Sequence, residues 1–225
     1  MIRLKHVRKA FQTGAGPKVV ADNISVTFPT GVAVALMGRN GAGKSTLMEM
    51  ISGSMDPDSG EIITTGTISW PVGYAGSFHR DLTGAQNTRF VARVYGVDSD
   101  ELVEFVEDFA ELGKHFHMPL RTYSSGMRSR LSFGVSMGIR FDTYLVDEVT
   151  SVGDAIFKVK SSAIFKDRMR ESGALFVSHS TRKMRQLCTA GAVLENGKLT
   201  YYDNVDDAIT HHLANLGTTE EESEE

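Results

Sequence analysis

The stretch GRNGAGKS at residues 38–45 constrains the fold more than any other part of the chain. It fits the pattern G-x-x-x-x-G-K-[ST] and lies between an apolar, strand-like run and a run with helical spacing, which is the context this motif requires. In such a loop the glycines let backbone N–H groups surround phosphates, a lysine reaches the β- and γ-phosphates, and a Ser or Thr hydroxyl binds Mg²⁺. The sequence therefore predicts a nucleotide site formed by Gly38, Arg39, Asn40, Gly41, Ala42, Gly43, Lys44, Ser45 and Thr46.

Strands and helices alternate on both sides of this loop, as in an α/β fold. Short runs rich in β-branched residues at 24–28 and 32–37 are typical of strands, and turn residues separate them. The continuous apolar runs at 143–148 and 174–179 are typical of buried parallel strands, and each ends in ionisable residues. A helix is expected between these two runs.

Further elements are predicted near the two ends of the chain. Residues 1–11 alternate apolar and basic side chains, which favours a strand. The stretch 60–70 reads as a small hairpin closing at Gly66, and a second hairpin turns at Asn196 and Gly197. A last helix follows the second hairpin.

Between residues 82 and 139 the pattern of apolar and polar residues becomes typical of helices. A representative segment, DSDELVEFVEDFAEL, has acidic residues in its first turn and apolar residues along one face. We therefore expect one nucleotide-binding domain over residues 1–215, with an inserted α-helical subdomain at about 80–138. Residues 216–225 form an acidic tail that is expected to be disordered.

Composition excludes several classes of protein. Five glutamates in the tail account for more than the whole net charge of −4, so the body is nearly neutral and has no basic stripe for nucleic acid. The single cysteine, Cys188, cannot form an internal disulfide, which favours a reducing compartment. No apolar run approaches the roughly 18 residues of a membrane helix, so a role at a membrane requires a partner.

Acidic residues at the end of the first buried run suit magnesium and water chemistry. Asp147 and Glu148 are neighbours on a strand and should point to different sides, so they can serve different tasks. We expect Asp147 to bind the metal and Glu148 to act as a base or orient water beside the γ-phosphate. The plain alternative is that both acids start a solvated loop. His179 occupies the same place after the next apolar run, and the other histidines form no ligand set for a structural metal.

The stretch TYSSGMRSRLSFG at 122–134 places Ser124, Ser125 and Gly126 where a loop turns into a helix. These residues are good helix caps, because a hydroxyl holds N–H groups that have no partner one turn back. A helix N-terminus also attracts anions, so the same residues could bind a phosphate held elsewhere. Both interpretations are open at this point.

The chain resembles the ATP-binding subunits of ABC transporters from about residue 2 to residue 212. DEVTSVGD is similar to a Walker B strand running into a D-loop, FVSHS to the switch-histidine motif, and YSSGM to a variant of the signature. The resemblance implies a P-loop NTPase (RecA-like) core with an N-terminal antiparallel β subdomain and the helical insert. It also implies ATP and Mg²⁺ as cofactors, Glu148 and His179 as catalytic residues, and adenine stacking on Phe11. Phe11 has the alternative role of ordinary strand core.

In this family two ATP-binding subunits meet head to tail, so the resemblance implies a homodimer. Each signature, here Ser124, Ser125 and Gly126, then faces the γ-phosphate held by the other copy. Through YSSGM, DEVTSVGD and the ending ENGKLTYYDNVDDAI, the chain also resembles the ATPases of capsular-polysaccharide exporters of Gram-negative bacteria. That similarity implies a separate integral membrane permease as partner, no nucleic acid, and a peripheral location on the cytoplasmic face of the inner membrane.

Four departures and alternatives remain. The usual Q-loop glutamine has no clear counterpart, Tyr74 being nearest, and residues 74–82 are the candidate docking groove for the permease. O-antigen and teichoic acid exporters share YSSGM. A non-transport ABC ATPase would usually have duplicated cassettes or a long coiled coil. A GTPase is suggested by DLTG at 81–84, but no N-K-x-D motif follows.

Overall fold

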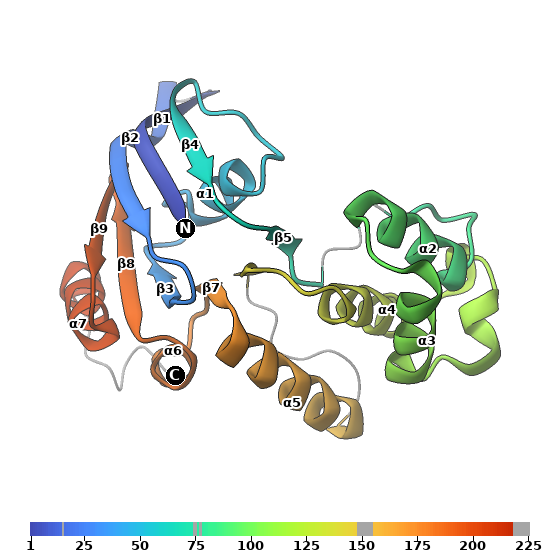
Figure 1. The fold of residues 1–225 in the computed structure, drawn as a ribbon. Coiled ribbons are helices and arrows are strands. Elements are labelled where there is room, and N and C mark those ends of the chain that lie inside the picture. The colour runs from blue at the N-terminus through green and yellow to red at the C-terminus, as the bar shows by residue number, and fades with distance from the viewer. Residues whose placement is uncertain (15, 74–75, 77, 148–154, 218–225) are drawn as a thin grey trace. The chain divides into compact units, whose positions relative to one another are not determined.

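The computed structural model describes residues 1–14, 16–73, 76, 78–147 and 155–217, which form two compact units. The first unit takes the described residues of Met1–Pro71, Phe141–Glu148 and Met169–Glu225. The second takes those of Val72–Arg140 and Val149–Arg168. Figure 1 shows the elements of both units, which are treated separately below.

The first unit begins with a three-stranded antiparallel sheet in the order β2-β1-β4. Its strands are β1 (Ile2–Thr13), β2 (Gly16–Phe28) and β4 (Ser59–Thr64). Apolar side chains alternate along β1, so one face of the sheet is buried and the other is polar. The predicted N-terminal strand is confirmed, and the strand predicted at 24–28 is the end of the longer β2.

A six-stranded sheet forms the centre of the first unit, in the order β5-β6-β7-β3-β8-β9. Neighbouring strands are parallel except for the β8–β9 pair, which is antiparallel. The strands are β3 (Ala33–Met37), β5 (Ile68–Pro71), β6 (Thr143–Asp147), β7 (Gly173–Val177), β8 (Ala190–Glu195) and β9 (Lys198–Tyr202). The predicted parallel strands and the hairpin at Asn196 and Gly197 are therefore confirmed.

The hairpin predicted over residues 60–70 is wrong. β4 pairs with β1 in the smaller sheet, whereas β5 pairs with β6 in the larger one. After the turn at Gly66, both the backbone N–H and the hydroxyl of Thr67 donate to Asp142 Oδ2, at 2.7 and 2.9 Å. These bonds hold the chain beside the start of β6, so the turn connects two sheets instead of folding one strand back on the other.

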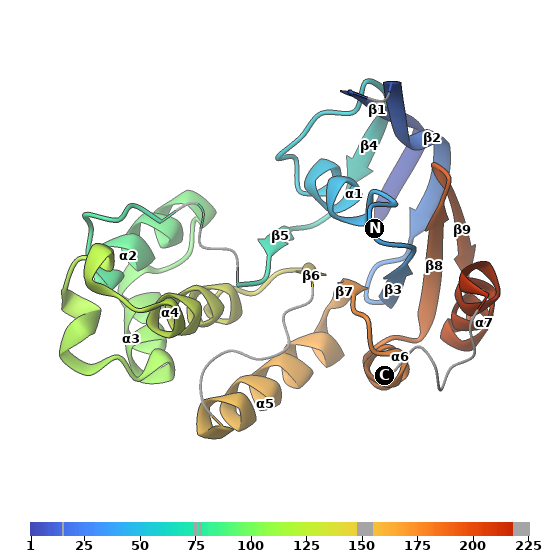
Figure 2. The same ribbon diagram turned by 180° about the vertical axis from the view of Figure 1, so that it is seen from behind.

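Three helices complete the first unit: α1 (Lys44–Ile51), α6 (Thr181–Leu187) and α7 (Val205–Leu216). One core combines side chains of both sheets with the buried side of α1, including Leu4, Leu36, Leu47, Leu145 and Leu194. Both views place α7 against β8 and β9 (Figures 1 and 2). The two sheets also meet at β2, where the Asp22 N–H donates to the Gly197 carbonyl at 2.8 Å and its carboxylate pairs with Lys198 at 2.8 Å.

The second unit is helical, as predicted for this part of the chain. It contains α2 (Gly84–Tyr95), α3 (Ser99–Ala110), the short 3₁₀ helices η1 (Gly113–His117) and η2 (Leu120–Thr122), α4 (Ser125–Gly138) and most of α5 (Ala155–Glu171). The buried face of α3 supplies Phe109, whose ring lies 6.0 Å from that of Phe133 and 5.3 Å from that of Phe157. The prediction of one domain over residues 1–215 stays a prediction.

Across the described ranges, no helix combines the length and apolar composition needed to span a bilayer. The acidic tail from residue 218 lies outside those ranges, so its expected disorder stays a prediction.

Candidate functional site

The glycine-rich loop joins the end of β3 at Met37 to the start of α1 at Lys44, as its motif predicts. Gly38 has φ 153, and a Cβ at that position would lie 2.3 Å from the Leu194 carbonyl oxygen of β8. Gly43 has φ 107, and a Cβ there would lie 2.8 Å from the Cβ of Val20 in β2. Both positions therefore require glycine, because the loop passes between two strands in a backbone conformation that other residues rarely adopt.

The loop delivers the start of α1 without a capping side chain. Inside the loop the Ala42 N–H donates to the Arg39 carbonyl at 3.0 Å, and the first helical bond runs from Leu47 N–H to the Gly43 carbonyl at 2.9 Å. Gly43 is the N-cap residue and has no side chain to accept the N–H groups of the first turn. Those N–H groups and the positive end of the helix dipole are suited to an anion such as a phosphate.

Lys44 adds a full positive charge at the same place. Its Nζ donates to the Gly38 carbonyl at 2.7 Å and to the Arg39 carbonyl at 3.2 Å, so the side chain folds back over the loop. Lys44 also lines the pocket beside the loop, where the motif predicts phosphates.

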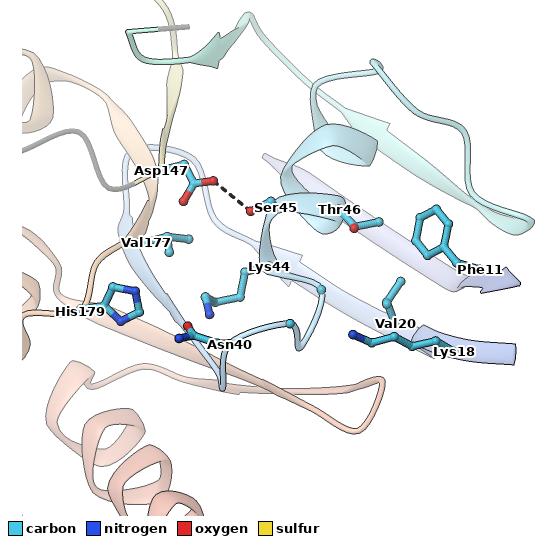
Figure 3. A pocket seen from close by; sticks show the side chains of 12 residues that line it. Phe11, Lys18, Val20, Asn40, Lys44, Ser45, Thr46, Asp147, Val177 and His179 are labelled. Atoms are coloured by element: carbon cyan, nitrogen blue, oxygen red, sulfur yellow. Dashed lines mark hydrogen bonds between the residues drawn. The ribbon is translucent and has the colours of Figure 1, made fainter. Parts of the chain in front are cut away.

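A pocket of about 460 Å³ opens beside the loop (Figure 3). Nine of its lining residues are predicted site residues: Phe11, Asn40, Gly41, Gly43, Lys44, Ser45, Thr46, Asp147 and His179. Three of the predicted loop residues, Gly38, Arg39 and Ala42, do not line it. The structure thus brings most of the predicted nucleotide residues of the first unit to one cavity, while their roles stay predictions.

The Ser45 hydroxyl donates to Asp147 Oδ2 at 3.0 Å, joining the start of α1 to the end of β6 (Figure 3). A hydroxyl and a carboxylate are hard oxygen ligands of the kind that Mg²⁺ prefers, and Mg²⁺ usually takes only one or two carboxylates beside phosphate oxygens. The described residues include no group of three or more His, Cys, Asp or Glu side chains placed to hold a metal. The pair therefore fits a magnesium ion that is completed by phosphate and water, and not one held by protein alone.

His179 follows the end of β7, which lies between β6 and β3 in the sheet. Because the carboxyl ends of parallel strands meet at one edge, His179, Asp147 and the loop after β3 all face the same pocket. His179 is exposed, and the buried Val177 forms the wall between these polar groups. Glu148, the other predicted catalytic residue, lies outside the described residues.

The far side of the pocket comes from the smaller sheet. Phe11 on β1 is partly exposed and is not part of the buried core, so the strand-core alternative for this residue is wrong. It stands opposite Lys18 of β2 in the strand register, and the Lys9 ammonium lies 5.6 Å from its ring centre. Sequence reasoning missed Lys18 and Val20 as pocket residues. The next predicted strand began at residue 24, so no predicted register placed these residues beside Phe11.

Ser124, Ser125 and Gly126 belong to the second unit. Ser124 is the N-cap of α4, and its hydroxyl accepts from the Met127 N–H at 3.2 Å, so the capping interpretation is confirmed. All three residues are exposed. Their contact with a phosphate of another copy stays a prediction.

The buried Tyr123 precedes this cap and fixes it in place. Its hydroxyl donates to the His115 carbonyl at 2.6 Å, and its own carbonyl accepts from the Arg128 guanidinium at 2.8 Å. Burial raises the pKa of Tyr123 to about 12, so the phenol stays protonated and continues to donate.

A second, smaller pocket of about 100 Å³ adjoins the first, and both are lined by Lys44 and His179. Its other side is the inner face of α7 with His212 and Leu216. Burial, followed by the nearby positive charge of Lys44, lowers the pKa of His212 below its usual 6.5. A neutral imidazole therefore lies behind the glycine-rich loop.

The DLTG stretch at 81–84, which suggested a GTPase, has structural roles. Thr83 caps α2 in a reciprocal capping box with Gln86, and Asp81 pairs with Arg121 at 2.8 Å. Both lie in the helical unit, whereas the glycine-rich loop belongs to the first unit.

Comparison with known proteins gives consistent results. The family model described as ABC transporter matches residues 21–151. The chain is 51% identical to the polysialic acid transport ATP-binding protein KpsT of Escherichia coli, over 94% of this chain and 96% of that protein. It is 41% identical to the capsule polysaccharide export ATP-binding protein CtrD of Neisseria meningitidis, over 94% of this chain and 98% of that protein.

Among solved structures, a dimeric ATP-binding cassette in a post-hydrolysis state bound to ADP and Pi has a TM-score of 0.74 with the chain. The identity is 18%, and the match covers 91% of this chain and 99% of that one. At this identity the match bears on the fold alone, and it confirms the predicted α/β fold with its antiparallel and helical parts.

Proposed function

The chain belongs to the ABC transporter family, and on that premise we propose that it binds and hydrolyses ATP to drive export of a capsular polysaccharide through a separate membrane subunit. The observation that carries the proposal is the single pocket that unites Lys44, the uncapped start of α1, the Ser45–Asp147 pair and Phe11. Each group suits one part of a magnesium nucleotide: Phe11 the base, Lys44 and the start of α1 the phosphates, and the Ser45–Asp147 pair the metal ion.

The phosphates bind at the glycine-rich loop. Backbone N–H groups at the start of α1 and the Lys44 ammonium donate charge-assisted hydrogen bonds, which contribute about 1.5–3 kcal/mol each. Phe11 stacks on adenine at the other end of the pocket, a contact that contributes about 1–3 kcal/mol and tolerates different bases. The loop therefore sets affinity for the phosphates, and the preference for ATP over GTP is expected to be modest.

The residues suited to Mg²⁺ are Ser45 and Asp147, which already lie within hydrogen-bond distance. When bound, the ion supplies positive charge that offsets the charge developing on the transferred phosphoryl group. The Asp147 carboxylate orients the Ser45 hydroxyl, so one oxygen atom of each residue can bind the same magnesium ion.

Hydrolysis additionally needs a group that directs water. Glu148 follows Asp147 directly and is proposed to accept a proton from the attacking water. His179 enters the pocket from the end of β7 and is proposed to contact the γ-phosphate. In this proposal water attacks the γ-phosphate directly, and the residues act by positioning the water and the phosphate, without a covalent intermediate on the protein.

The active assembly is proposed to be a homodimer. The pocket of the first unit contains no signature residue, whereas Ser124, Ser125 and Gly126 form an exposed helix N-terminus in the second unit. A second copy that brings this N-terminus to the γ-phosphate would complete the site. ATP then binds the closed dimer more tightly than the separate copies, because residues of both copies contact it in the closed dimer. Hydrolysis removes this difference in affinity.

The exported substrate follows from the relatives. Two of them are named for transport of polysialic acid and export of capsule polysaccharide, and the chain covers almost their full length. We infer the same class of polymer here, an integral membrane permease as the partner, and a location at the cytoplasmic face of the inner membrane. Residues 74–82 remain the candidate docking region for the permease.

Nucleotide binding is tested first with the purified chain. A fluorescent ATP analogue should bind to the wild type and to Lys5→Ala, a change at a lysine of β1 that pairs with Glu61 of β4 and does not line the pocket. Lys44→Ala should bind no measurable analogue. Absence of binding to the wild type, or normal affinity of Lys44→Ala, would refute the proposed site.

The transport role is tested in the source cell. Deleting the gene should leave polymer inside the cell, and the wild-type gene but not the Lys44→Ala gene should restore it to the surface. Normal surface polymer in the deletion strain would exclude the export function while leaving ATP binding intact.

A further inference from the structure

We propose that Lys18 is a second lysine ligand of the nucleotide, contacting its α- or β-phosphate from the side opposite Lys44. The inference rests on the proposed nucleotide function and adds a residue outside the glycine-rich motif. It predicts that the small sheet contributes to phosphate binding as well as to base stacking.

Lys18 is placed at the pocket by the register of the small sheet. It stands opposite Phe11 in the β1–β2 pair, and both residues line the pocket. Figure 3 shows its side chain running from β2 toward the glycine-rich loop. A Cβ built on Gly41 would lie 3.2 Å from Lys18 Nζ, so the ammonium group lies beside Gly41 of the loop.

The two lysines of the pocket differ in how they are held. Lys44 Nζ donates to two carbonyl groups of the loop, whereas Lys18 is exposed and its ammonium group forms no hydrogen bond or ion pair within the described ranges. Asp147, the one acidic residue among the described lining residues, is hydrogen-bonded to Ser45. The Lys18 ammonium is therefore available to an anion that enters the pocket.

The order of groups along the pocket indicates which phosphate Lys18 meets. Figure 3 draws Phe11 at one end of the pocket and Asp147 with His179 at the other, and the proposed function assigns the base to the first end and the γ-phosphate to the second. Lys18 is the register partner of Phe11 and reaches the loop at Gly41, between those ends. Its contact is therefore with the α- or β-phosphate, which ATP and ADP share.

The test compares binding of fluorescent ATP and ADP analogues to purified variants. Lys18→Gln should weaken both by about tenfold at low salt, which is the loss of roughly one charge-assisted hydrogen bond. Lys18→Arg should retain most of the affinity, because it keeps the charge. The matched control Lys5→Gln, on the neighbouring strand and paired with Glu61, should bind like the wild type. Unchanged melting temperatures show that each variant is folded.

Salt gives a second readout. The difference between wild type and Lys18→Gln should shrink as salt rises, since an exposed charge is screened. Wild-type affinity of Lys18→Gln for both nucleotides would overturn the inference, and a loss confined to ATP would overturn the assignment to the α- or β-phosphate. Either result leaves the proposed function in place, provided that Lys44→Ala still abolishes binding. A wild type that binds no nucleotide would instead refute the function itself.

Discussion

The Ser45 hydroxyl donates a hydrogen bond to Asp147 at 3.0 Å, although the two residues are 102 positions apart in the chain. The bond joins the first turn of α1 to the last residue of β6. It holds two oxygen atoms of the kind that Mg²⁺ prefers close together beside the glycine-rich loop.

Removing either oxygen should raise the magnesium requirement. Asp147→Asn and Ser45→Ala are each expected to shift half-maximal ATPase activity to at least about tenfold more Mg²⁺, since even outer-shell changes cost that much in metal affinity. Nucleotide binding measured in EDTA should stay close to wild type, because the loop and Lys44 are unchanged. An unaltered magnesium curve for both variants would mean that the ion binds elsewhere.

The homodimer should be trapped by slowing hydrolysis. Glu148→Gln keeps the size of the side chain but removes the proposed base, so ATP should remain bound and hold two copies together. Gel filtration with ATP is expected to show a dimer, and gel filtration with ADP a monomer. A variant that binds ATP and remains monomeric would contradict the shared site.

The signature can be tested without losing its helix cap. In the Glu148→Gln background, Ser124→Asp should preserve the stability of α4, because Asp is as good an N-cap as Ser, but its charge should repel a phosphate. The ATP-dependent dimer is then expected to disappear at an unchanged melting temperature. The matched change Asn204→Asp, at the N-cap of α7, should leave the dimer intact. Dimers in both variants would show that Ser124 does not face a phosphate.

Gly38→Ala should disturb the glycine-rich loop from its strand side. The new Cβ would lie 2.3 Å from the Leu194 carbonyl, so the loop or β8 must move. We expect a loss of about 1–3 kcal/mol in the free energy of unfolding, measured with urea, together with weaker ATP binding. Gly14→Ala meets nothing within 4 Å and should behave as the wild type. Equal stability of the two variants would place the loop farther from β8.

Acid should destabilise the region behind the loop through His212. Burial first, then Lys44, His211 and His179, lower its pKa below 6.5, and Glu195 opposes them. The unfolded chain then binds more protons, so the contribution of His212 to stability is complete above about pH 6.5 and falls as the pH drops through its folded pKa. His212→Gln should flatten the fall in unfolding free energy between about pH 7 and pH 5. Parallel curves for wild type and variant would show that His212 does not contribute.

The sequence was sufficient for the features that depend on local pattern. The loop motif, the buried runs before Asp147 and His179, and the Ser124 cap each occupy a short stretch whose residue types determine the local geometry. The meeting of the loop, Asp147 and His179 at one sheet edge also follows, because carboxyl ends of parallel strands lie together.

Pairing over long distances was not predictable in the same way. The residues on either side of Gly66 are typical of a hairpin, whereas the pairing of β5 with β6 and the Thr67–Asp142 bonds show that the second strand joins another sheet. Lys18 has no motif, and it reaches the pocket only because the β1–β2 register sets it opposite Phe11. Register and sheet membership are tertiary properties, so one chain's local pattern leaves them open.

The pocket takes its walls from both sheets, with Phe11, Lys18 and Val20 from one and Asp147 and Val177 from the other. Apart from their shared core, these sheets are tied by the contacts of Asp22 with the β8–β9 hairpin. A nucleotide bound in this pocket would contact both sheets and restrain their motion relative to each other. Its release would remove that restraint, so occupancy of the pocket would influence the rigidity of the first unit.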